Sequence, residues 1–227
     1  MTALILAALF FVIVHIGVAG TRLRDGVVAA IGLRGYMIAF SLASVAGIWW
    51  LVAAYKGAPY EPLWGQPNWW KIVADVLMLP AFLLVVIGLL TPNPTAVAQE
   101  KLVGQEPRGV VRVTRHPFLM GVALWAVLHL IANGDLASVL LFGAFFVTAL
   151  AGAPSIDAKR RRALGGPAWD AFARRTSILP FGAIAAGRNT LDFGGIGWWR
   201  IGLGVLAYAL FIGGHVHIVG VSPFPVR

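Results

Sequence analysis

The stretch VRVTRHPFLMGVALWAVLHLIAN, residues 111–133, combines the features that decide how this chain folds. It begins with the basic residues Arg112 and Arg115 and continues with His116 and a proline, the residue type that often starts a helix. The apolar run that follows is long enough to cross most of a bilayer as a helix, and it carries a second histidine, His129. The stretch therefore predicts one wall of a functional site in an integral membrane protein.

The composition of the whole chain agrees with a membrane protein. Of its 227 residues, 59% are apolar and only 12% are charged, whereas a soluble domain carries about 25% charged residues. The chain has no cysteine, which excludes disulfides, cysteine-ligated zinc, iron–sulfur clusters and thiolate catalysis. The Lys and Arg residues that give the chain its net charge of +9 lie mostly between the apolar runs. We therefore expect the lipid bilayer as its partner, and no nucleic acid.

Six apolar runs of roughly membrane length predict an all-α fold, a polytopic membrane protein with a bundle of about six transmembrane helices. We expect one domain over residues 1–227. The first run lacks the basic start and the cleavage site of a signal peptide, so we expect it to be retained. The fourth run is short, about 16 residues or roughly 24 Å of helix. The six runs are Ala3–Gly20, Tyr36–Tyr55, Ile72–Leu90, Pro117–Ala132, Leu136–Ala153 and Ile201–Gly220.

The basic residues predict the orientation of the chain. All but three of its 18 Lys and Arg residues lie in the loops 20–35, 91–116 and 154–200. Since loops rich in Lys and Arg face the cytoplasm, both termini are predicted to face the opposite side. In a bacterium this is a multi-pass protein of the inner membrane with periplasmic termini. The three exceptions are Lys56, Lys71 and Arg227.

Three local patterns outside the central stretch also carry predictions. The Pro- and Trp-rich segment 56–70 is typical of an interfacial aromatic belt, with a lid over a ligand entrance as the alternative. Residues 167–175 predict an amphipathic helix on anionic headgroups, because Trp169 and Phe172 share one face beside two arginines. Asp75 lies four residues after Lys71, which favours an ion pair over a functional carboxylate.

The five histidines, all in or at the edges of the six runs, are the main site candidates. A single histidine in a helix bundle is explained by a bond between helices. Several, with hardly another ionisable group in the runs, indicate ligands, because neutral imidazole binds haem iron and other metals. Depth along straight helices pairs His129 with His215 and His15 with His116, but tilt would allow His15 to meet His129. The remaining histidine is His217.

Three segments, residues 11–50, 113–135 and 174–191, resemble the NnrU family of bacterial membrane proteins. That family is linked to denitrification and includes the 15-cis-zeta-carotene isomerases. The isomerases are similar to this chain in a segment around His15, in a TRHP segment at 114–117, and in a tryptophan followed four residues on by a histidine, here Trp125 and His129.

The resemblance implies a cofactor and its ligands. The isomerases are haem b proteins, and their axial histidines fall by motif position on His15 and His129, which are therefore the expected metal ligands. Their alternative cysteine ligand falls on Ala126, so that part of their ligand switch cannot operate here. We expect His215 as the alternative partner, and Arg112, Arg115 and His116 as further cofactor-binding candidates, the arginines pairing with haem propionates or with lipid phosphates.

A second resemblance leads to an alternative function. Residues 115–121 and the run from Asp157 to Pro180 are similar to segments that enclose S-adenosylmethionine in isoprenylcysteine carboxyl methyltransferases, although Leu119 replaces a tyrosine. The leading expectation is a haem b protein of the NnrU type, linked to nitric oxide metabolism or to isomerisation of an apolar small-molecule substrate such as a polyene. The alternatives are an S-adenosylmethionine-dependent membrane methyltransferase and a non-enzymatic factor with a respiratory enzyme partner.

Overall fold

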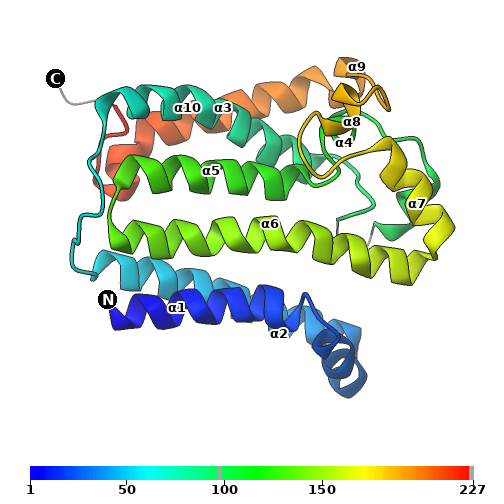
Figure 1. Ribbon diagram of the computed structural model, residues 1–227, viewed down its shortest axis with the longest axis horizontal. Helices are drawn as coiled ribbons and strands as arrows, with labels where there is room; N and C mark the ends of the chain where they lie inside the picture. Colours follow the sequence, from blue (N-terminus) through cyan, green and yellow to red (C-terminus); the bar gives the residue numbers. More distant parts are fainter. Residues whose placement is uncertain (97–98, 225–227) are drawn as a thin grey trace.

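The computed structural model describes residues 1–96 and 99–224, and its long elements are all helices (Figure 1). The predicted all-α membrane architecture is confirmed. Four helices are long and apolar enough to span a membrane: α2 (Leu23–Lys56), α3 (Asn68–Leu90), α6 (Leu136–Leu164) and α10 (Trp198–Val219). Two shorter apolar helices complete the six, namely α1 (Thr2–Val12) with the π-helix η1 (Ile13–Val18), and α5 (Pro117–Asn133). Arg227, one of the three exceptional basic residues, lies outside the described residues.

The long helices pack one against the next in the order α10, α3, α5, α6, α1 and α2 (Figure 1). The central stretch forms α5, which lies between α3 and α6. The described N-terminus of α1 and the C-terminus of α10 lie at the same end of the bundle (Figure 1). Helix α5 therefore contacts α3 on one side and α6 on the other, so its side chains are positioned to form a site with either neighbour.

Close packing of α5 on α3 depends on two glycines. A Cβ atom on Gly121 would lie 2.8 Å from the Ala81 carbonyl oxygen, and one on Gly88 would lie 2.9 Å from the backbone nitrogen of Phe118. Helices in lipid gain little from the hydrophobic effect, so they associate through small residues that let their backbones approach. The two glycines therefore set the distance between α3 and α5.

Helices α2 and α6 extend beyond the predicted apolar spans in different ways. Helix α2 consists of two helical segments joined at a kink, where Gly32 is non-helical with φ 73° and ψ 163°, and the segment after the kink begins close to the predicted Tyr36. Helix α6 ends at Leu164, where Ala153 was predicted. The extension of α6 carries the KRRR run at 159–162, which continues the helix because Lys and Arg are good helix formers outside the bilayer as well as at its edge. Hydropathy detects only the part of a helix in contact with lipid.

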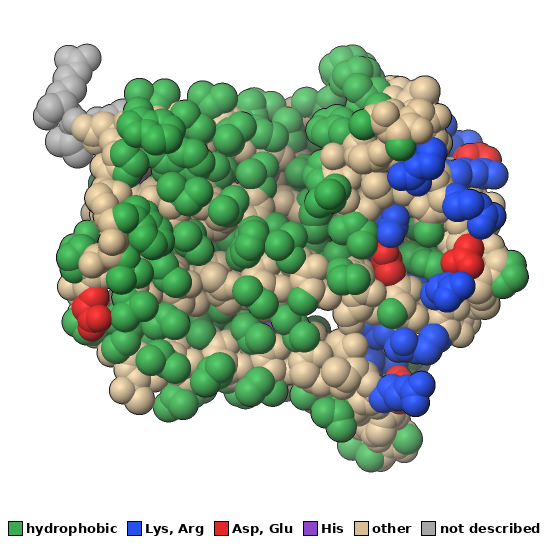
Figure 2. Space-filling model, in the orientation of Figure 1, with side chains coloured by type: hydrophobic (Ala, Val, Ile, Leu, Met, Phe, Trp, Pro, Cys, Tyr) green, Lys and Arg blue, Asp and Glu red, His purple; other side chains and the backbone are tan. Residues whose placement is uncertain are grey.

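The basic residues gather at one end of the bundle, where Figure 2 shows the blue side chains. We call it the basic end, and the opposite end, which holds His129, the histidine end. The basic end contains short elements that connect the spans: the 3-10 helix η2 (Glu100–Gly104), α4 (Val110–Val113), α7 (Gly166–Arg175), α8 (Gly182–Ala185) and α9 (Phe193–Ile196).

The prediction that residues 167–175 lie on lipid headgroups is wrong. Trp169 and Phe172 of α7 are each only 3% exposed, and they form one apolar cluster with Val110, Val111 and Val113. Two apolar residues three positions apart share one face of a helix, which indicates that this face is buried. The spacing cannot distinguish burial in lipid from burial against another part of the same chain. Helix α7 therefore closes a small protein core at the basic end.

The tryptophan-rich loop at the histidine end caps helix α5. The indole of Trp64 donates to the Ile131 carbonyl at 3.0 Å, and the indole of Trp70 donates to the Leu128 carbonyl at 3.3 Å. The loop backbone also donates to the Gly134 carbonyl. The bond to Ile131 satisfies a carbonyl group in the last turn of α5 that has no partner within the helix, and the bonds to Leu128 and Gly134 hold the loop against the same end. The loop thus covers the last turns of α5, on which His129 lies.

Candidate functional site

His129 is the centre of an aromatic cluster at the histidine end. Its ring stacks on Phe142 of α6, with 4.8 Å between ring centres, and lies 5.0 Å from the ring of Trp125. The ring of His215 from α10 lies 6.4 Å away, with the two ring planes 20° apart. The depth argument paired these two histidines, and the structure places them side by side.

The ring nitrogens of three histidines are arranged alike. Nδ1 lies 2.8 Å from the Phe11 carbonyl in His15, 2.9 Å from the Trp125 carbonyl in His129, and 2.7 Å from the Val221 carbonyl in His215. A carbonyl oxygen only accepts, so Nδ1 carries the proton and Nε2 carries the lone pair. This tautomer, with Nδ1 bound to a carbonyl, is the one that metal-ligating histidines adopt when they bind through Nε2.

His15 lies apart from the other two. It is in the π-helix η1, a local irregularity that occurs frequently at functional sites. Its ring contacts Phe11 and Phe40, and its Nε2 is 3.3 Å from the Ser44 hydroxyl. That hydroxyl has one proton and lies closer, at 2.7 Å, to the Phe40 carbonyl, so Nε2 of His15 keeps only a weak partner.

Aromatic side chains connect His15 to His129 without bringing them together. Phe11 contacts both His15 and Phe145, Phe145 contacts Trp125, and Trp125 contacts His129. Among the described residues no direct ring contact joins His15 to His129, the pair implied by family resemblance, and the two are connected through these aromatic side chains. The structure as it stands places His215, the alternative partner, next to His129.

An apolar pocket adjoins this cluster. It has a volume of about 240 Å³ and is lined by Ala81, Phe82 and Val85 of α3, Val122 and Trp125 of α5, and Phe145 of α6. No charged side chain lines it. Trp125 belongs both to the pocket and to the His129 cluster. Its side chain would therefore contact both a molecule in the pocket and the His129 imidazole. The pocket suits an apolar ligand that reaches it from the bilayer.

Asp75 of α3 is the single carboxylate within the six predicted spans. The predicted pair with Lys71 is not among the seven ion pairs of the described residues, so that prediction is wrong. Asp75 lies where α3 packs on α10, since its backbone carbonyl accepts a hydrogen bond from the Tyr208 hydroxyl of α10 at 2.8 Å.

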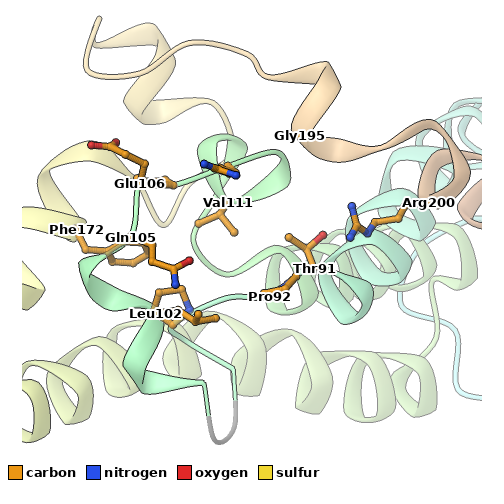
Figure 3. A pocket seen from close by; sticks show the side chains of 12 residues that line it. Thr91, Pro92, Leu102, Gln105, Glu106, Val111, Phe172, Gly195 and Arg200 are labelled. Carbon is orange, nitrogen blue, oxygen red and sulfur yellow. The ribbon is translucent and has the colours of Figure 1, made fainter.

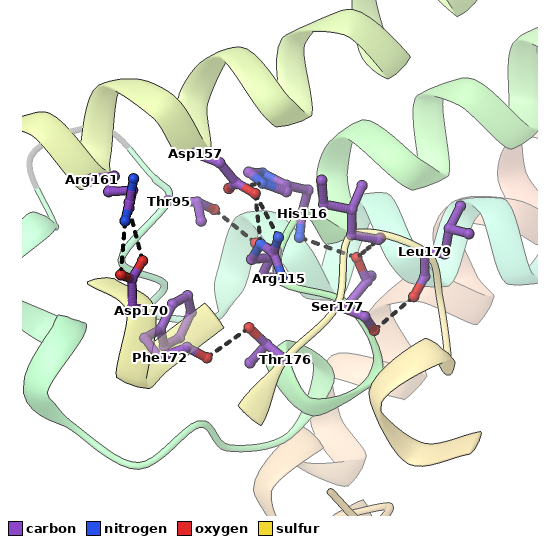
Figure 4. A network of polar contacts seen from close by, with 12 residues as sticks. Thr95, Arg115, His116, Asp157, Arg161, Asp170, Phe172, Thr176, Ser177 and Leu179 are labelled. Atoms are coloured by element: carbon purple, nitrogen blue, oxygen red, sulfur yellow. Dashed lines mark hydrogen bonds and ion pairs between the residues drawn. The ribbon is translucent and has the colours of Figure 1, made fainter. Parts of the chain in front are cut away.

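At the basic end, Arg115 and His116 are bound to a shared carboxylate (Figure 4). Asp157 accepts two hydrogen bonds from Arg115, at 2.9 and 2.6 Å, and its other oxygen lies 2.7 Å from Nε2 of His116. The side chains are 12%, 14% and 1% exposed for Arg115, Asp157 and His116. Together they form an almost buried network between α5 and α6, and Asp157, which was noted only for its motif position, is its centre.

Arg112 is directed into the loops of the basic end. It donates to the Pro107 carbonyl at 2.8 Å and to the Thr190 hydroxyl at 3.2 Å, and it lies 4.0 Å from Asp192. Hydrogen bonds from the backbone N–H groups of Gly109 and Gly195, followed by the charge of Arg112, hold the pKa of Asp192 below its usual range. Both predicted arginines therefore have partners within the protein.

The donors at the histidine end are Nε2 of His129 and Nε2 of His215. Their ring centres lie 6.4 Å apart, and each Nε2 carries the lone pair because Nδ1 is bound to a carbonyl. Neutral imidazole is the type of side chain that haem iron takes as a ligand. Among the described residues, no group of three or more His, Asp or Glu side chains is placed to hold a bare metal ion.

Comparison with known proteins agrees with this membrane architecture. The family described as NnrU protein matches residues 3–223. Two proteins described as chloroplastic 15-cis-zeta-carotene isomerase, from Arabidopsis thaliana and Zea mays, are each 27% identical to the chain over 194 and 193 residues. The matched region is 83% of this chain and 52% of each isomerase, so the chain spans about half the length of these relatives. No solved structure matches it.

Proposed function

Because this chain belongs to the NnrU family of membrane proteins, we propose that it binds an elongated apolar polyene within the bilayer and isomerises one of its double bonds. The apolar pocket beside His129 carries this proposal. Its relatives are named for acting on 15-cis-zeta-carotene, a conjugated hydrocarbon with no polar group for a protein to bind. Recognition of such a substrate requires apolar and aromatic walls, which the pocket has.

The pocket residues position the substrate. Phe82 and Val85 from α3 and Phe145 from α6 approach from opposite sides of α5, so a flat chain between them is held by dispersion and ring contacts. Trp125 separates the substrate from His129 by one ring. The lining is apolar, so a charge that develops on the polyene would be weakly screened and would interact with groups beyond the wall.

We propose haem b as the cofactor, held by Nε2 of His129 and of His215. When bound, it would supply a redox-active iron that can exchange an electron with a conjugated chain. The chain's own residues set the environment: the Trp125 and Val221 carbonyls fix the two tautomers, and Phe142 holds the His129 ring in place by stacking. His15 would act from a second position, beyond the aromatic side chains that separate it from His129.

Filling the pocket is expected to abolish isomerisation while the protein stays folded. In Val122→Phe the larger ring occupies space that the substrate needs, so turnover of 15-cis-zeta-carotene should fall at least tenfold, roughly the cost of losing one well-packed contact. The measurement is chromatography of carotene isomers after dark incubation with protein in lipid nanodiscs. Val147→Phe, at an exposed position of α6, is the control and should keep its activity. Equal activity in both variants would contradict the proposed pocket.

The visible spectrum of the purified protein tests the cofactor. We expect a Soret band, which should be lost or shifted in His129→Ala and in His215→Ala because each removes one of the two proposed nitrogen ligands. His217→Ala is the control, since His217 is exposed and follows His215 by two positions on α10. The absence of a Soret band would sink the haem proposal. A shift in His15→Ala, with none in His215→Ala, would instead favour the pair His15 and His129.

We also propose that the basic end faces the cytoplasm of a bacterial cell, following the positive-inside rule. The native chain has no cysteine, so a single introduced cysteine reports its own position. A maleimide that cannot cross the inner membrane should label Gly65→Cys, in the loop at the histidine end, in intact cells. It should label Ala186→Cys, which is exposed at the basic end, only after permeabilisation. The reverse labelling pattern would overturn this orientation.

A further inference from the structure

The basic end contains a second cavity, distinct from the apolar pocket. It has a volume of about 260 Å³, and its lining combines arginine and hydroxyl groups with apolar side chains (Figure 3). The cavity lies at the membrane boundary, because Thr91 directly follows the last residue of α3 and Arg200 is in the first turn of α10. Trp198 and Trp199, on the same turn, are 74% and 57% exposed, as expected for tryptophans at a lipid headgroup layer.

The Thr91 hydroxyl lacks a partner inside this cavity. Thr91 is only 7% exposed, and among the described residues its Oγ1 accepts and donates no hydrogen bond. A buried polar group without a partner costs free energy, so the great majority are satisfied by protein, water or ligand. In Figure 3 the side chains of Thr91 and Arg200 point toward one another across one side of the cavity. The hydroxyl oxygen is itself buried, so a ligand that meets the guanidinium would reach it only after a small rearrangement of the lining.

Two arginines give the cavity a net positive charge. Neither Arg108 nor Arg200 takes part in the ion pairs found among residues 1–96 and 99–224. Arg200 is held in place by bonds to the Leu90 and Ile196 carbonyls, at 3.2 and 2.9 Å, and it lies 4.7 Å above the ring of Trp199. The one carboxylate in the lining, Glu106, is paired with Arg175. An anion would thus meet two guanidinium groups that lie outside these ion pairs, although the charge of Arg108 also acts on Asp192, whose pKa it helps to lower.

We propose that this cavity binds the phosphate group of an anionic amphiphile at the membrane surface. Arg200 and Arg108 would hold the phosphate oxygens, since guanidinium groups bind phosphate through charge-assisted hydrogen bonds. The Thr91 hydroxyl would donate to a third oxygen. Leu102, Val111 and Phe172 form the apolar part of the lining and would contact the carbon chain beside the phosphate. The same chemistry would accept a free phosphate ion, without the apolar contact.

Calorimetry on the full-length protein in a neutral detergent tests the proposal. The probes are dihexanoyl phosphatidic acid, dihexanoyl phosphatidylcholine and inorganic phosphate. We expect phosphatidic acid to bind, and Arg108→Gln and Arg200→Gln to weaken its binding roughly tenfold or more, as expected for loss of a bond to a charged group. Thr91→Val removes only the hydroxyl and keeps the shape, so it should weaken binding without unfolding the protein. Arg34→Gln, an exposed site on α2, removes the same charge elsewhere and should bind as the native protein does.

The outcomes separate the two sources of phosphate. Binding of phosphatidic acid, but not of inorganic phosphate, identifies a lipid headgroup, whereas equal binding of both identifies the phosphate ion alone. The proposal is overturned if phosphatidic acid and phosphatidylcholine bind equally while inorganic phosphate does not bind. It is also overturned if Arg108→Gln, Arg200→Gln and Thr91→Val all bind as Arg34→Gln does. None of these results depends on isomerase activity.

Discussion

Asp157→Asn is expected to destabilise the folded protein by about 3–5 kcal/mol, the cost of removing one partner from a buried ion pair. The carboxylate accepts from both Arg115 and His116, and all three side chains are nearly buried between α5 and α6. The asparagine keeps the size of the side chain but leaves the Arg115 charge without a counter-ion. The measurement is the midpoint and free energy of denaturant unfolding in lipid bicelles.

A second ion pair supplies the control for this substitution. Asp170 also accepts two bonds from one arginine, Arg161, at 2.9 and 3.0 Å, but the pair is largely exposed to solvent. Asp170→Asn is therefore expected to cost much less stability than Asp157→Asn. Replacing both charges, as Arg115→Met with Asp157→Leu, should cost less than Asp157→Asn alone, because no uncompensated charge remains. Equal losses in Asp157→Asn and Asp170→Asn would show that the buried network does not contribute as inferred.

Gly121→Ala is expected to cost about 3 kcal/mol, at the upper end of the range for overpacking, and to abolish isomerisation. The added methyl would lie 2.7 Å from Cγ2 of Val85 and 2.8 Å from the Ala81 carbonyl oxygen. Backbone atoms cannot move aside as the end of a flexible side chain can, so α3 and α5 must separate. Ala81 and Val85 also line the apolar pocket, which would change shape. Thermal unfolding and the carotene assay together measure both effects.

Gly143 of α6 provides the matched control. A methyl group there would meet no heavy atom within 4 Å, so Gly143→Ala should be neutral or stabilising by up to about 1 kcal/mol through helix propensity. The two variants make the same chemical change in the middle of a span. If both leave stability and activity unchanged, the close approach of α3 and α5 does not determine the pocket.

The architecture could be predicted because lipid imposes a simple rule on sequence. Every span must be a run of apolar residues of nearly fixed length. The six runs identified the four long apolar helices and the two shorter ones, α5 among them. The ends of α2 and α6 could not be predicted in this way. Beyond the bilayer the constraint on composition disappears, so a helix such as α6 can continue through a basic run to Leu164.

The candidate site was predictable in part. Histidines in apolar helices are conspicuous, and depth along the helices matched His129 with His215, whose ring centres lie 6.4 Å apart. Depth did not choose between that pair and the pair of His15 with His129, which the family resemblance favoured. The Asp157 network and the apolar pocket were not predictable, because each is formed by residues from different helices whose rotation about their axes is not encoded in hydropathy. For the same reason Trp169 and Phe172 were predicted to contact lipid, although they are buried against α4.

The apolar pocket also affects how the protein must be measured. Since charged side chains are absent from its lining and it lies in the middle of α3, α5 and α6, an apolar ligand reaches it by lateral diffusion within the lipid. The concentration that governs occupancy is then the mole fraction of ligand in the membrane, and not its amount per volume of buffer. Added substrate-free lipid should therefore slow turnover at constant total substrate, as in surface-dilution kinetics. For the proposed isomerisation the apparent Michaelis constant would then be a two-dimensional quantity, and affinities measured in detergent and in bilayers should be compared on that scale.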